Sequence, residues 1–350
     1  MRASVRFLLT LLFLGLLTSV FPAQARASAS DQRLPRLIEA ARQEGVVDFA
    51  GPASLTPAGA QALMDALNKK YGLSLKVNFS PLTSYTGLVA KIIAEAQAAQ
   101  TPTYDVILVT DAHIVSLYSR NLLESFDWAG TFPHIPPQSI MLDNQAVMTD
   151  AIFAIPAYNT RLVRPQDVPK TWEDILDPKW KGKIVVSTGM QIWTRLTQRW
   201  GEEKTEEFMR RLADLKPIIG RYPEIHPRLE SGEYAIAANQ LSPFITGSEE
   251  KKAPVAYALE VKPIVVLLDV MTQVKNVRHP NAAKLFMAFS LTPEGQEIWW
   301  KYGKRTSPFV KGTPAWKFVQ GKELLFGDKD FLLKREEELI ERYGKIIGLR

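Results

Sequence analysis

The chain has 350 residues, 46% of them hydrophobic and 23% charged, which is the composition of a globular protein long enough for two domains. It contains no cysteine, so disulfide bonds and thiolate chemistry are excluded. The formal net charge of +6 comes from basic residues interspersed with acids, as in 201–211, and not from basic blocks, so we expect no nucleic-acid partner.

The first 25 residues have the pattern of a secretory signal peptide. Arg2 and Arg6 make the start positive, residues 7–20 form a short apolar run, and an Ala-x-Ala spacing ends at Ala25. The alternative is an uncleaved membrane anchor, but the run is short for a span of about 20 residues. A lipoprotein would need a cysteine at the cleavage point, and the chain has none. We therefore predict that 1–25 is removed and that a soluble protein, not lipid-anchored, is released into the periplasm.

Residues 31–150 repeat one unit, a strand followed by a helix, after an opening helix over 31–44. Gly45 and Gly72 are predicted to end the first two helices. The predicted strands are 46–50, 75–79 and 105–109, and the predicted helices after them are 56–71, 87–100 and 113–120. This order predicts a parallel sheet with helices on both faces, which we interpret as a first lobe.

The apolar run 151–158, which Pro156 interrupts, is interpreted as the crossing into a second lobe over 151–263. A second apolar run, 263–269, is interpreted as the strand that returns to the first lobe, which resumes over 264–350. That last part has predicted helices over 281–290, 294–302 and 328–343. The predicted fold class is therefore α/β with two lobes, a mixed and mostly parallel sheet flanked by helices in each, and two hinge crossings.

Several predicted strands end in small or hydroxyl residues that lead directly into a helix. The stretch 171–191 shows this most clearly, with a strand over 183–186 and a Ser-Thr-Gly loop over 187–189. Such a junction presents free backbone N–H groups and the positive end of the helix dipole. The other junctions are 51–56, 80–86, 110–111 and, more weakly, 239–242. Ligands of open α/β sheets bind beyond the carboxyl ends of the strands, so we expect these junctions to face one inter-lobe cleft and to bind an anion or a polar solute. Plain helix capping is the alternative for any one of them.

The predicted ligand contacts are polar side chains at these junctions, namely Ser54, Ser84, Thr110, Asp111, Ser187, Thr188, Gln191 and Asn239. Tyr85 and Tyr158 are included because a phenol stacks on or hydrogen-bonds a solute, although either could equally be a hinge or core contact. Arg221 is included as a partner for a carboxylate or phosphate, with a solvated arginine as the alternative. Asp269 is interpreted as a helix cap.

Sequence patterns for catalysis are absent. There is no Gly-x-Ser-x-Gly, P-loop or Gly-x-Gly-x-x-Gly motif. Glu230 lies four residues after His226, but Pro227 argues against a helix that presents the two on one face. The histidines are too scattered for a local metal site, and they are His113, His134, His226 and His279. We therefore predict no enzymatic activity, no resident metal and no cofactor.

Several segments resemble bacterial periplasmic solute-binding proteins of ABC transporters. The segment TWEDILDPKWKGK at 171–183 resembles part of the second lobe in this family. LIEAARQEGVV, YDVILVTDA, ESGEYAIAAN and HPNAAKLFMAFSLTPEGQE, at 37–47, 104–112, 230–239 and 279–297, resemble its other signatures. The match is to the iron(III)-type branch and covers nearly the whole mature chain. It implies the type II periplasmic-binding fold and a protein that closes its lobes on a solute, docks on an inner-membrane ABC permease and performs no chemistry. We expect a monomer.

The residues that bind iron in this branch are not found at the matching positions. Iron-binding members have two adjacent tyrosines after the strand that ends here at Ala238, where 239–241 reads Asn-Gln-Leu. There is also no histidine near Ala53 and no acid within 84–87. Fe(III) prefers phenolate and carboxylate oxygens, so we predict an organic or phosphorylated anion as the solute. The alternatives are an Fe(III)-binding protein of an iron importer, a periplasmic ligand sensor for a membrane receptor kinase, and an enzyme on the same fold.

Overall fold

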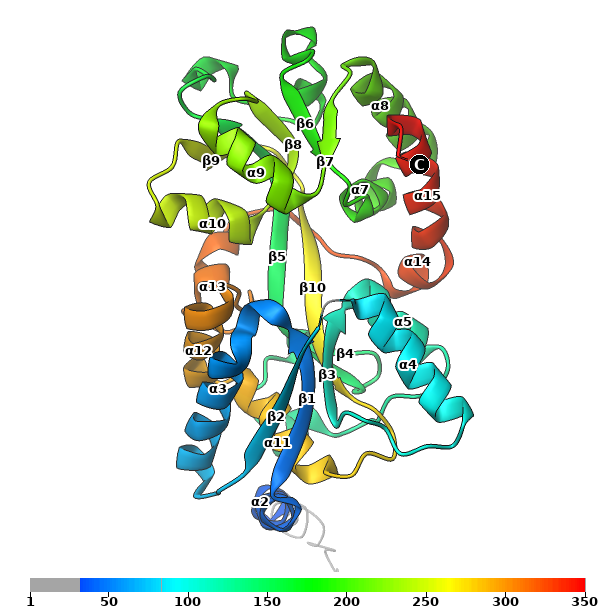
Figure 1. The fold of residues 1–350 in the computed structure, drawn as a ribbon, viewed down its shortest axis with the longest axis vertical. Helices are drawn as coiled ribbons and strands as arrows, with labels where there is room; N and C mark the ends of the chain where they lie inside the picture. Colours follow the sequence, from blue (N-terminus) through cyan, green and yellow to red (C-terminus); the bar gives the residue numbers. More distant parts are fainter. Residues whose placement is uncertain (1–31, 83, 350) are drawn as a thin grey trace, which may run out of the picture.

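The structure, a computed structural model, describes residues 32–82 and 84–349 (Figure 1). The predicted signal peptide, 1–25, lies outside the described residues. Within those two ranges, none of the helices combines the length and the apolar character that a membrane span requires.

The strands of the described part are β1 (Val46–Pro52), β2 (Lys76–Leu82), β3 (Val106–Thr110), β4 (Ile140–Met141), β5 (Ala146–Asn159), β6 (Ile184–Ser187), β7 (Ile218–Gly220), β8 (Ile236–Leu241), β9 (Val255–Tyr257), β10 (Ile264–Gln273) and β11 (Leu324–Leu325). Its α-helices are α2 (Arg33–Glu44), α3 (Thr56–Tyr71), α4 (Tyr85–Gln97), α5 (Asp111–Tyr118), α6 (Trp128–Thr131), α7 (Gln191–Trp200), α8 (Glu202–Asp214), α9 (Tyr222–Ser231), α10 (Ser242–Glu250), α11 (Pro280–Ser290), α12 (Pro293–Gly303), α13 (Pro314–Val319), α14 (Lys329–Lys334) and α15 (Glu336–Ile347). Short 3-10 helices are η1 (Ala53–Leu55), η2 (Pro137–Ser139), η3 (Pro165–Asp167), η4 (Glu173–Leu176) and η5 (Pro178–Trp180).

These strands form one mixed sheet, whose main path has the order β2-β1-β3-β10-β5-β8-β6-β7. β1 pairs in parallel with β2 and β3, and β6 pairs in parallel with β7 and β8. β5 and β10 are antiparallel to each other and to their outer neighbours, β8 and β3. The order β1-α3-β2-α4-β3-α5 confirms the strand–helix repeat predicted for the first lobe. The predicted α/β class, with a mixed and mostly parallel sheet, is therefore confirmed.

Two long strands, β5 and β10, run between the two lobes (Figure 1). They pair with each other, and the register of that pair shifts between Asp269 and Val270. The register of β5 with β8 also shifts, between Ile155 and Ala157. The second shift surrounds Pro156, which has no N–H to give to a neighbouring strand. Such irregularities bend a strand and increase its twist, and both lie along β5, at Thr149 and at Pro156, so the first predicted crossing carries built-in bends.

Helices cover both faces of each half of the sheet, and aromatic side chains fill the space beneath them. In the lower lobe of Figure 1, α2, α3, α11 and α12 lie to one side and α4 and α5 to the other. The ring of Phe49 on β1 lies 5.0 Å from that of Phe286 on α11. In the upper lobe, the ring of Trp193 lies 5.7 Å from the rings of both Trp172 and Phe208. Trp193 is fully buried, so it belongs to the core of the second lobe.

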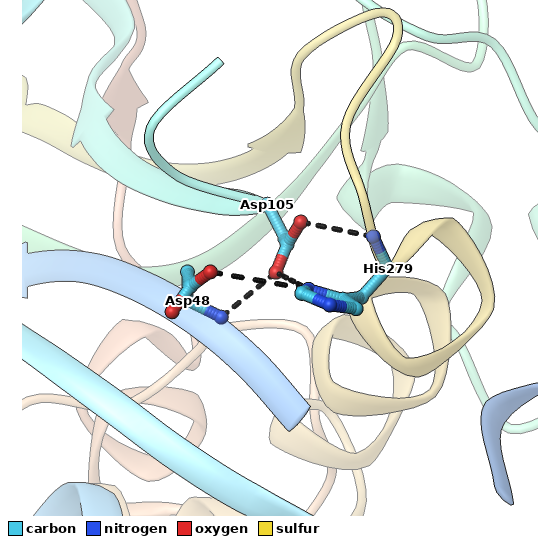
Figure 2. Close-up of side chains that lie close together, drawn as sticks. All are labelled: Asp48, Asp105 and His279. Carbon is cyan, nitrogen blue, oxygen red and sulfur yellow. Dashed lines mark hydrogen bonds and ion pairs between the residues drawn. The ribbon is translucent and has the colours of Figure 1, made fainter. Parts of the chain in front are cut away.

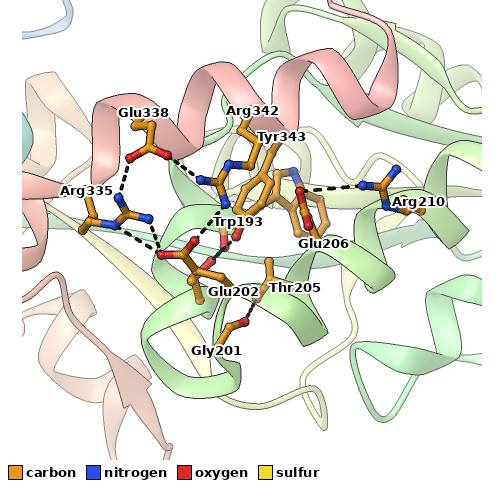
Figure 3. Close-up of polar contacts among 11 residues, drawn as sticks. Trp193, Gly201, Glu202, Thr205, Glu206, Arg210, Arg335, Glu338, Arg342 and Tyr343 are labelled. Carbon is orange, nitrogen blue, oxygen red and sulfur yellow. Dashed lines mark hydrogen bonds and ion pairs between the residues drawn. The ribbon is translucent and has the colours of Figure 1, made fainter.

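The end of the chain lies on the second lobe, which corrects the prediction that 264–350 belongs wholly to the first. The single helix predicted over 328–343 is two helices, separated at Arg335. α14 packs on α5, whereas α15 packs on α7 and α8 because the apolar face of α15 is buried there. Figure 3 shows the polar contacts that hold α15 on α8. Glu202 accepts hydrogen bonds from Nε of Arg335 at 3.2 Å and from Nη1 of Arg342 at 2.8 Å.

Gly295, in the first turn of α12, has no room for a side chain. Its N–H donates to the capping hydroxyl of Thr292 at 3.0 Å, and a Cβ there would overlap the carbonyl oxygen of Phe289. Gly295→Ala is therefore expected to lower the free energy of unfolding, measured with urea, by about 1–3 kcal/mol. Gly303→Ala, at the end of the same helix, is the control, since its Cβ would meet Trp299 at an ordinary 3.5 Å. An equal loss in the two variants would contradict the steric explanation.

Candidate functional site

The strand pairing determines which loops face each other between the lobes. β3 is antiparallel to β10 and β8 is antiparallel to β5, so the carboxyl ends of β3 and β8 both point toward the middle of the β5–β10 pair. β1 and β2 run parallel to β3, and β6 and β7 run parallel to β8. The junctions that the sequence singled out therefore lie in the region between the two lobes of Figure 1, the region where ligands of open α/β sheets bind.

A small cavity of about 180 Å³ lies at the ends of β1 and β2 in the first lobe. It is lined by the predicted residues Ser54, Ser84 and Tyr85, and also by Arg305, which is not among the predicted contacts. Nη2 of Arg305 donates to Oγ of Ser54 at 2.9 Å. Oγ of Ser84 accepts from the N–H of Gly87 at 3.0 Å and so caps α4. A guanidinium and a helix N-terminus thus lie beside one cavity, which suits an anionic group.

Two buried aspartates lie behind Arg305 on the crossing strands. Asp150 on β5 and Asp269 on β10 are opposite each other and are 1% and 2% exposed. Arg305 pairs with Asp269, and its Nη1 lies 3.9 Å from Oδ1 of Asp150. That oxygen has no hydrogen-bond partner among the described residues. The interpretation of Asp269 as a helix cap was wrong, because this residue lies in the middle of a strand.

Burial governs protonation in this group. It raises the pKa of Asp150 well above its ordinary value, and the charge of Asp269 raises that pKa further, while Arg305 opposes both effects. Burial also raises the pKa of Asp269, against the opposing charge of Arg305. Burial alone would lower the pKa of Arg305. The charges of Asp269 and Asp150 outweigh the effect of burial, so the pKa of Arg305 is raised. The pKa of the Tyr85 phenol is raised by burial and then by Asp269. The cluster therefore favours a charged guanidinium, a neutral phenol and a carboxyl pair that retains a proton.

In the second lobe, Ser187 and Asn239 are bonded to each other. The N–H of Ser187 donates to Oδ1 of Asn239 at 2.9 Å, and Nδ2 of Asn239 donates to Oγ of Ser187 at 2.7 Å. Both residues are fully buried. Thr188 is exposed, and its N–H donates to the carbonyl oxygen of Gly220 at 3.1 Å. The predicted ligand role of Ser187 and Asn239 is thus corrected, since these two side chains fix the loop after β6, and Thr188 is the residue of this set that reaches the surface.

Asp111, another predicted ligand contact, is held by the second lobe. Nη1 and Nη2 of Arg195 on α7 donate to its Oδ2 and Oδ1 at 2.9 and 3.0 Å. Nε of Arg195 donates to Oε1 of Glu336 on α15 at 2.8 Å. All three residues are buried. Burial alone would lower the pKa of Arg195, but Asp111 and Glu336 raise it. The prediction for Asp111 is corrected, because its carboxylate joins the lobes and is not free for a solute.

Thr110 and Gln191 do not line the Arg305 cavity. Oγ1 of Thr110 lies 2.7 Å from Nδ1 of His113, in the first turn of α5. Gln191 and His113 line a separate cavity of about 560 Å³ between α4, α5 and the C-terminal helices. The structure therefore does not bring these two predicted contacts together with Ser54, Ser84 and Tyr85.

Tyr158 and Arg221, the last two predicted contacts, do not line the Arg305 cavity either. Tyr158 is opposite Ile236 at the start of β8, the end of that strand remote from the cleft. Arg221 is exposed, and its Nε donates to Oε1 of Glu224 at 2.8 Å in the first turn of α9. Tyr158 therefore lies at the end of its strand pair remote from the cleft, whereas Arg221 follows the carboxyl end of β7, outside the Arg305 cavity, and its predicted ligand role stays a prediction.

The comparisons with known proteins agree with this architecture. A model of the bacterial extracellular solute-binding protein family matches residues 62–326, well over half of the chain. The chain belongs to this family. Among solved structures, this solute-binding protein is similar to iron-bound HitA from Pseudomonas aeruginosa, with a TM-score of 0.69, 19% identity, and coverage of 86% of this chain and 99% of that one. It is also similar to AfuA from Actinobacillus pleuropneumoniae, a periplasmic binding protein with fructose-6-phosphate bound, with a TM-score of 0.66, 22% identity, and coverage of 87% and 99%. These likenesses show that the fold is that of the two-lobed periplasmic-binding proteins.

A shorter match is found among curated proteins. An uncharacterized protein of Haemophilus influenzae is 29% identical to this solute-binding protein over 148 residues, which are 39% of this chain and 42% of that protein. The chain thus spans less than half the length of the curated relative it matches. That relative does not narrow the identity of the solute.

A Ser-His-Glu group in this solute-binding protein is structural. His226 and Glu230 lie one turn apart on α9, with Nε2 of His226 3.4 Å from Oε1 of Glu230. The prediction that Pro227 prevents this was wrong, because the helix continues through the proline and loses only one N–H donor. Nε2 of Gln240 lies 3.2 Å from Nδ1 of His226, so Nδ1 accepts and the ring proton is on Nε2, which faces Oγ of Ser248 at 2.8 Å. Ser248 is fully buried, so the group has neither a free base nor an accessible nucleophile.

Asp48, Asp105 and His279 lie close together, as Figure 2 shows. Their potential metal-ligating atoms are all within 4.8 Å of one another, and no other group of three His, Asp or Glu side chains in the described part of the chain meets this criterion. These three residues lie near the amino ends of β1 and β3, away from the cleft. Asp105 accepts from the N–H of Asp48 at 2.8 Å, and from Nδ1 and the N–H of His279 at 2.8 and 3.1 Å. Asp48 accepts from Asn78 at 2.8 Å. These contacts join β1, β3 and α11, and they account for the group without a metal.

Proposed function

We propose that this protein binds a small organic anion in the cleft between its lobes and delivers it to an inner-membrane ABC permease. In this proposal it acts in the periplasm after loss of 1–25, performs no chemistry on the solute and needs no cofactor. Membership of the solute-binding family supports the transport role. One observation carries the nature of the solute, which is the position of Arg305 beside the cavity at the ends of β1 and β2.

Arg305 has the properties of an anion receptor. Its side chain is 15% exposed, so it is desolvated but still within reach of the cavity. A guanidinium has five N–H donors in a fixed plane, and the contacts with Asp269 and Ser54 use only part of them. Such a group binds a carboxylate or phosphate through paired hydrogen bonds. The N-terminus of α4, capped by Ser84, adds a favourable dipole at the same cavity.

Fe(III) is less well supported as the solute. Although HitA is iron-bound, its 19% identity to this chain is evidence for the fold only. The carboxyls of Asp150 and Asp269 lie behind Arg305, and burial raises the pKa of both. Burial also raises the pKa of Tyr85, which keeps its phenol protonated at neutral pH. A hard trivalent cation needs deprotonated oxygen ligands and would be repelled by Arg305.

Capture would proceed by closure of the lobes around the β5–β10 pair. These strands are the long connections between the lobes, and the pairing of β5 shifts register at Thr149 and again at Pro156. A solute that contacts both lobes stabilises the closed arrangement relative to the open one. The closed protein is then the form that the permease binds.

The test compares wild type with Arg305→Gln by calorimetric titration with citrate, phenyl phosphate and glucose 6-phosphate. At least one of these anions is expected to bind wild type and raise its melting temperature. Arg305→Gln is expected to weaken that binding at least about tenfold, since it removes the charged donor. Arg228→Gln is the matched control, because Arg228 is exposed and paired with Glu233. Equal affinities in wild type and Arg305→Gln, or co-purified iron that survives dialysis, would contradict the proposal.

A further inference from the structure

A second cavity, of about 380 Å³, adjoins Arg305 between α10, α12 and α13. Phe153 on β5 and Tyr257 on β9 line it from the strands, and Trp300 and Phe318 line it from α12 and α13. Arg305 lines this cavity and also the small cavity at the ends of β1 and β2. We call the larger cavity, defined by these five residues, the aromatic chamber. Its walls come from elements of both lobes (Figure 1).

Three of the chamber's four aromatic rings lie close together, those of Phe318, Phe153 and Tyr257. The ring of Phe318 lies 4.8 Å from that of Phe153 and 6.2 Å from that of Tyr257. Phe318, Tyr257 and Trp300 are partly exposed. The Nζ atoms of Lys322 and Lys304 lie 4.8 and 5.7 Å from the ring centres of Phe318 and Trp300, so these two rings offer an edge or one remaining face. Ring pairs at such distances attract each other beyond the effect of buried area alone. A flat apolar group entering the chamber would therefore find aromatic partners already in place.

Most polar side chains of the chamber are already engaged within the protein. Oγ of Ser242 accepts from the N–H of Phe153 at 3.1 Å, and the hydroxyl of Tyr257 donates to the carbonyl oxygen of Phe153 at 3.2 Å. Oγ1 of Thr306 accepts from a backbone N–H of α13 at 3.1 Å. Hydroxyl groups of a solute body buried here would lose their hydrogen bonds to water and regain few of them. The chamber thus disfavours a polyol.

The charges of the chamber direct an acidic group toward Arg305. Nζ of Lys304 lies 2.7 Å from Oε1 of Glu250, an ion pair that links the end of α12 to α10 across the lobes. The opposite charges of Lys304 and Glu250 largely cancel, and the exposed carboxylate of Glu249 adds negative charge on α10. An anionic group is repelled from the α10 side and attracted by the guanidinium. The solute would therefore have its acid at Arg305 and its body against the rings.

We propose that the solute is an aromatic organic anion, with its ring in the aromatic chamber and its carboxylate or phosphate on Arg305. This inference rests on the proposed function, in which Arg305 binds the acidic group. A dry cavity of about 150 Å³ is large enough for benzene, so the chamber admits a substituted ring together with its linkage to the acid. The solute differs in kind from the fructose-6-phosphate bound to AfuA.

The experiment measures the gain in affinity that an aromatic ring supplies when the acidic group is kept constant. Phenyl phosphate is compared with methyl phosphate, and phenylacetate with acetate, by calorimetric titration of the full mature protein. In wild type, the compound with the ring is expected to bind at least about tenfold more tightly than its ring-free partner in one of the two pairs. The pair that shows this gain identifies the preferred acidic group as phosphate or carboxylate. Phe318→Ala is expected to lose most of that gain and to leave the affinity for the small anion unchanged. Phe318→Leu, which keeps apolar volume without the ring, is expected to lose part of it.

Trp316→Ala is the matched control, since Trp316 lies on the same helix, α13, but does not line the chamber. Melting temperatures without anion show that each variant is folded. Glucose 6-phosphate binding as tightly as phenyl phosphate, or an unchanged ring gain in both Phe318 variants, would overturn the chamber assignment. If Arg305→Gln still weakens anion binding in that case, the proposed function stands. If Arg305→Gln changes nothing, the proposed function itself fails.

Discussion

Arg195→Met is expected to lower the free energy of unfolding by about 3–5 kcal/mol at pH 7, measured with urea. Arg195 is fully buried and is the shared partner of Asp111 and Glu336, which are 2% and 3% exposed. Its loss would leave two carboxylates buried together without the charge that compensates them. The penalty is large because the partners cannot reach water, unlike those of a surface ion pair.

The controls for this prediction separate charge from packing. Arg199→Met changes the same residue type on the same helix, but Arg199 is 63% exposed and lies 3.6 Å from Glu323, so a loss below about 1 kcal/mol is expected. Replacing Arg195, Asp111 and Glu336 together with apolar residues is expected to recover most of the stability, since no unpaired charge remains. If Arg195→Met lost no more stability than Arg199→Met, the buried ion group could not be what holds the segments together.

This ion group links three separate parts of the chain. Asp111 begins α5 of the first lobe, Arg195 lies on α7 of the second, and Glu336 begins α15. α15 is thus tied by charge to Arg195 of the second lobe, which in turn holds Asp111 of the first lobe, in addition to the packing of α15 on α7 and α8. An acid at a strand–helix junction, which on sequence alone resembles a ligand contact, here holds the lobes together.

The architecture of the first lobe could be predicted because its signals are local. Alternating apolar residues define strands, and Gly45 and Gly72 end α2 and α3 with φ of 73° and 63°, as predicted. The crossings could be predicted because strands buried on both sides are continuous apolar runs. The division of the C-terminal helix at Arg335 and its position on the second lobe depend on tertiary packing, which no local pattern reports.

The site was only partly predictable for the same reason. Ser54, Ser84 and Tyr85, which line the cavity beside Arg305, could be proposed from the sequence because each lies at a strand–helix junction. Arg305 was missed because it follows a helix in a Lys-Arg pair, which has the pattern of a solvated helix end. Its burial depends on Asp269, 36 residues earlier, and on Ser54, 251 residues earlier. Contacts over such separations have no signature in a single sequence.

Asp150→Asn is expected to make stability less dependent on pH and to raise it above that of wild type in alkaline solution. Burial raises the pKa of Asp150 in the folded protein, and so does the charge of Asp269, whereas Arg305 and a hydrogen bond from Thr149 oppose the shift. In the unfolded chain an aspartate ionises near pH 4. From there upward, until the folded pKa is passed, the folded protein holds more protons than the unfolded one. Its free energy of unfolding therefore falls as pH rises, by at most about 1.4 kcal/mol per pH unit for one proton.

The measurement is urea unfolding of wild type and Asp150→Asn between pH 5 and pH 9. Asparagine has the shape of the protonated acid but cannot ionise, so the stability of the variant relative to wild type should increase steadily with pH. Asp65→Asn, at an exposed position on α3, controls for the general loss of a carboxylate and should run parallel to wild type. Parallel curves for wild type and Asp150→Asn would mean that Asp150 stays ionised in the fold. Arg305 would then face two carboxylates, its charge would be more than balanced, and its role as an anion receptor would lose its electrostatic basis.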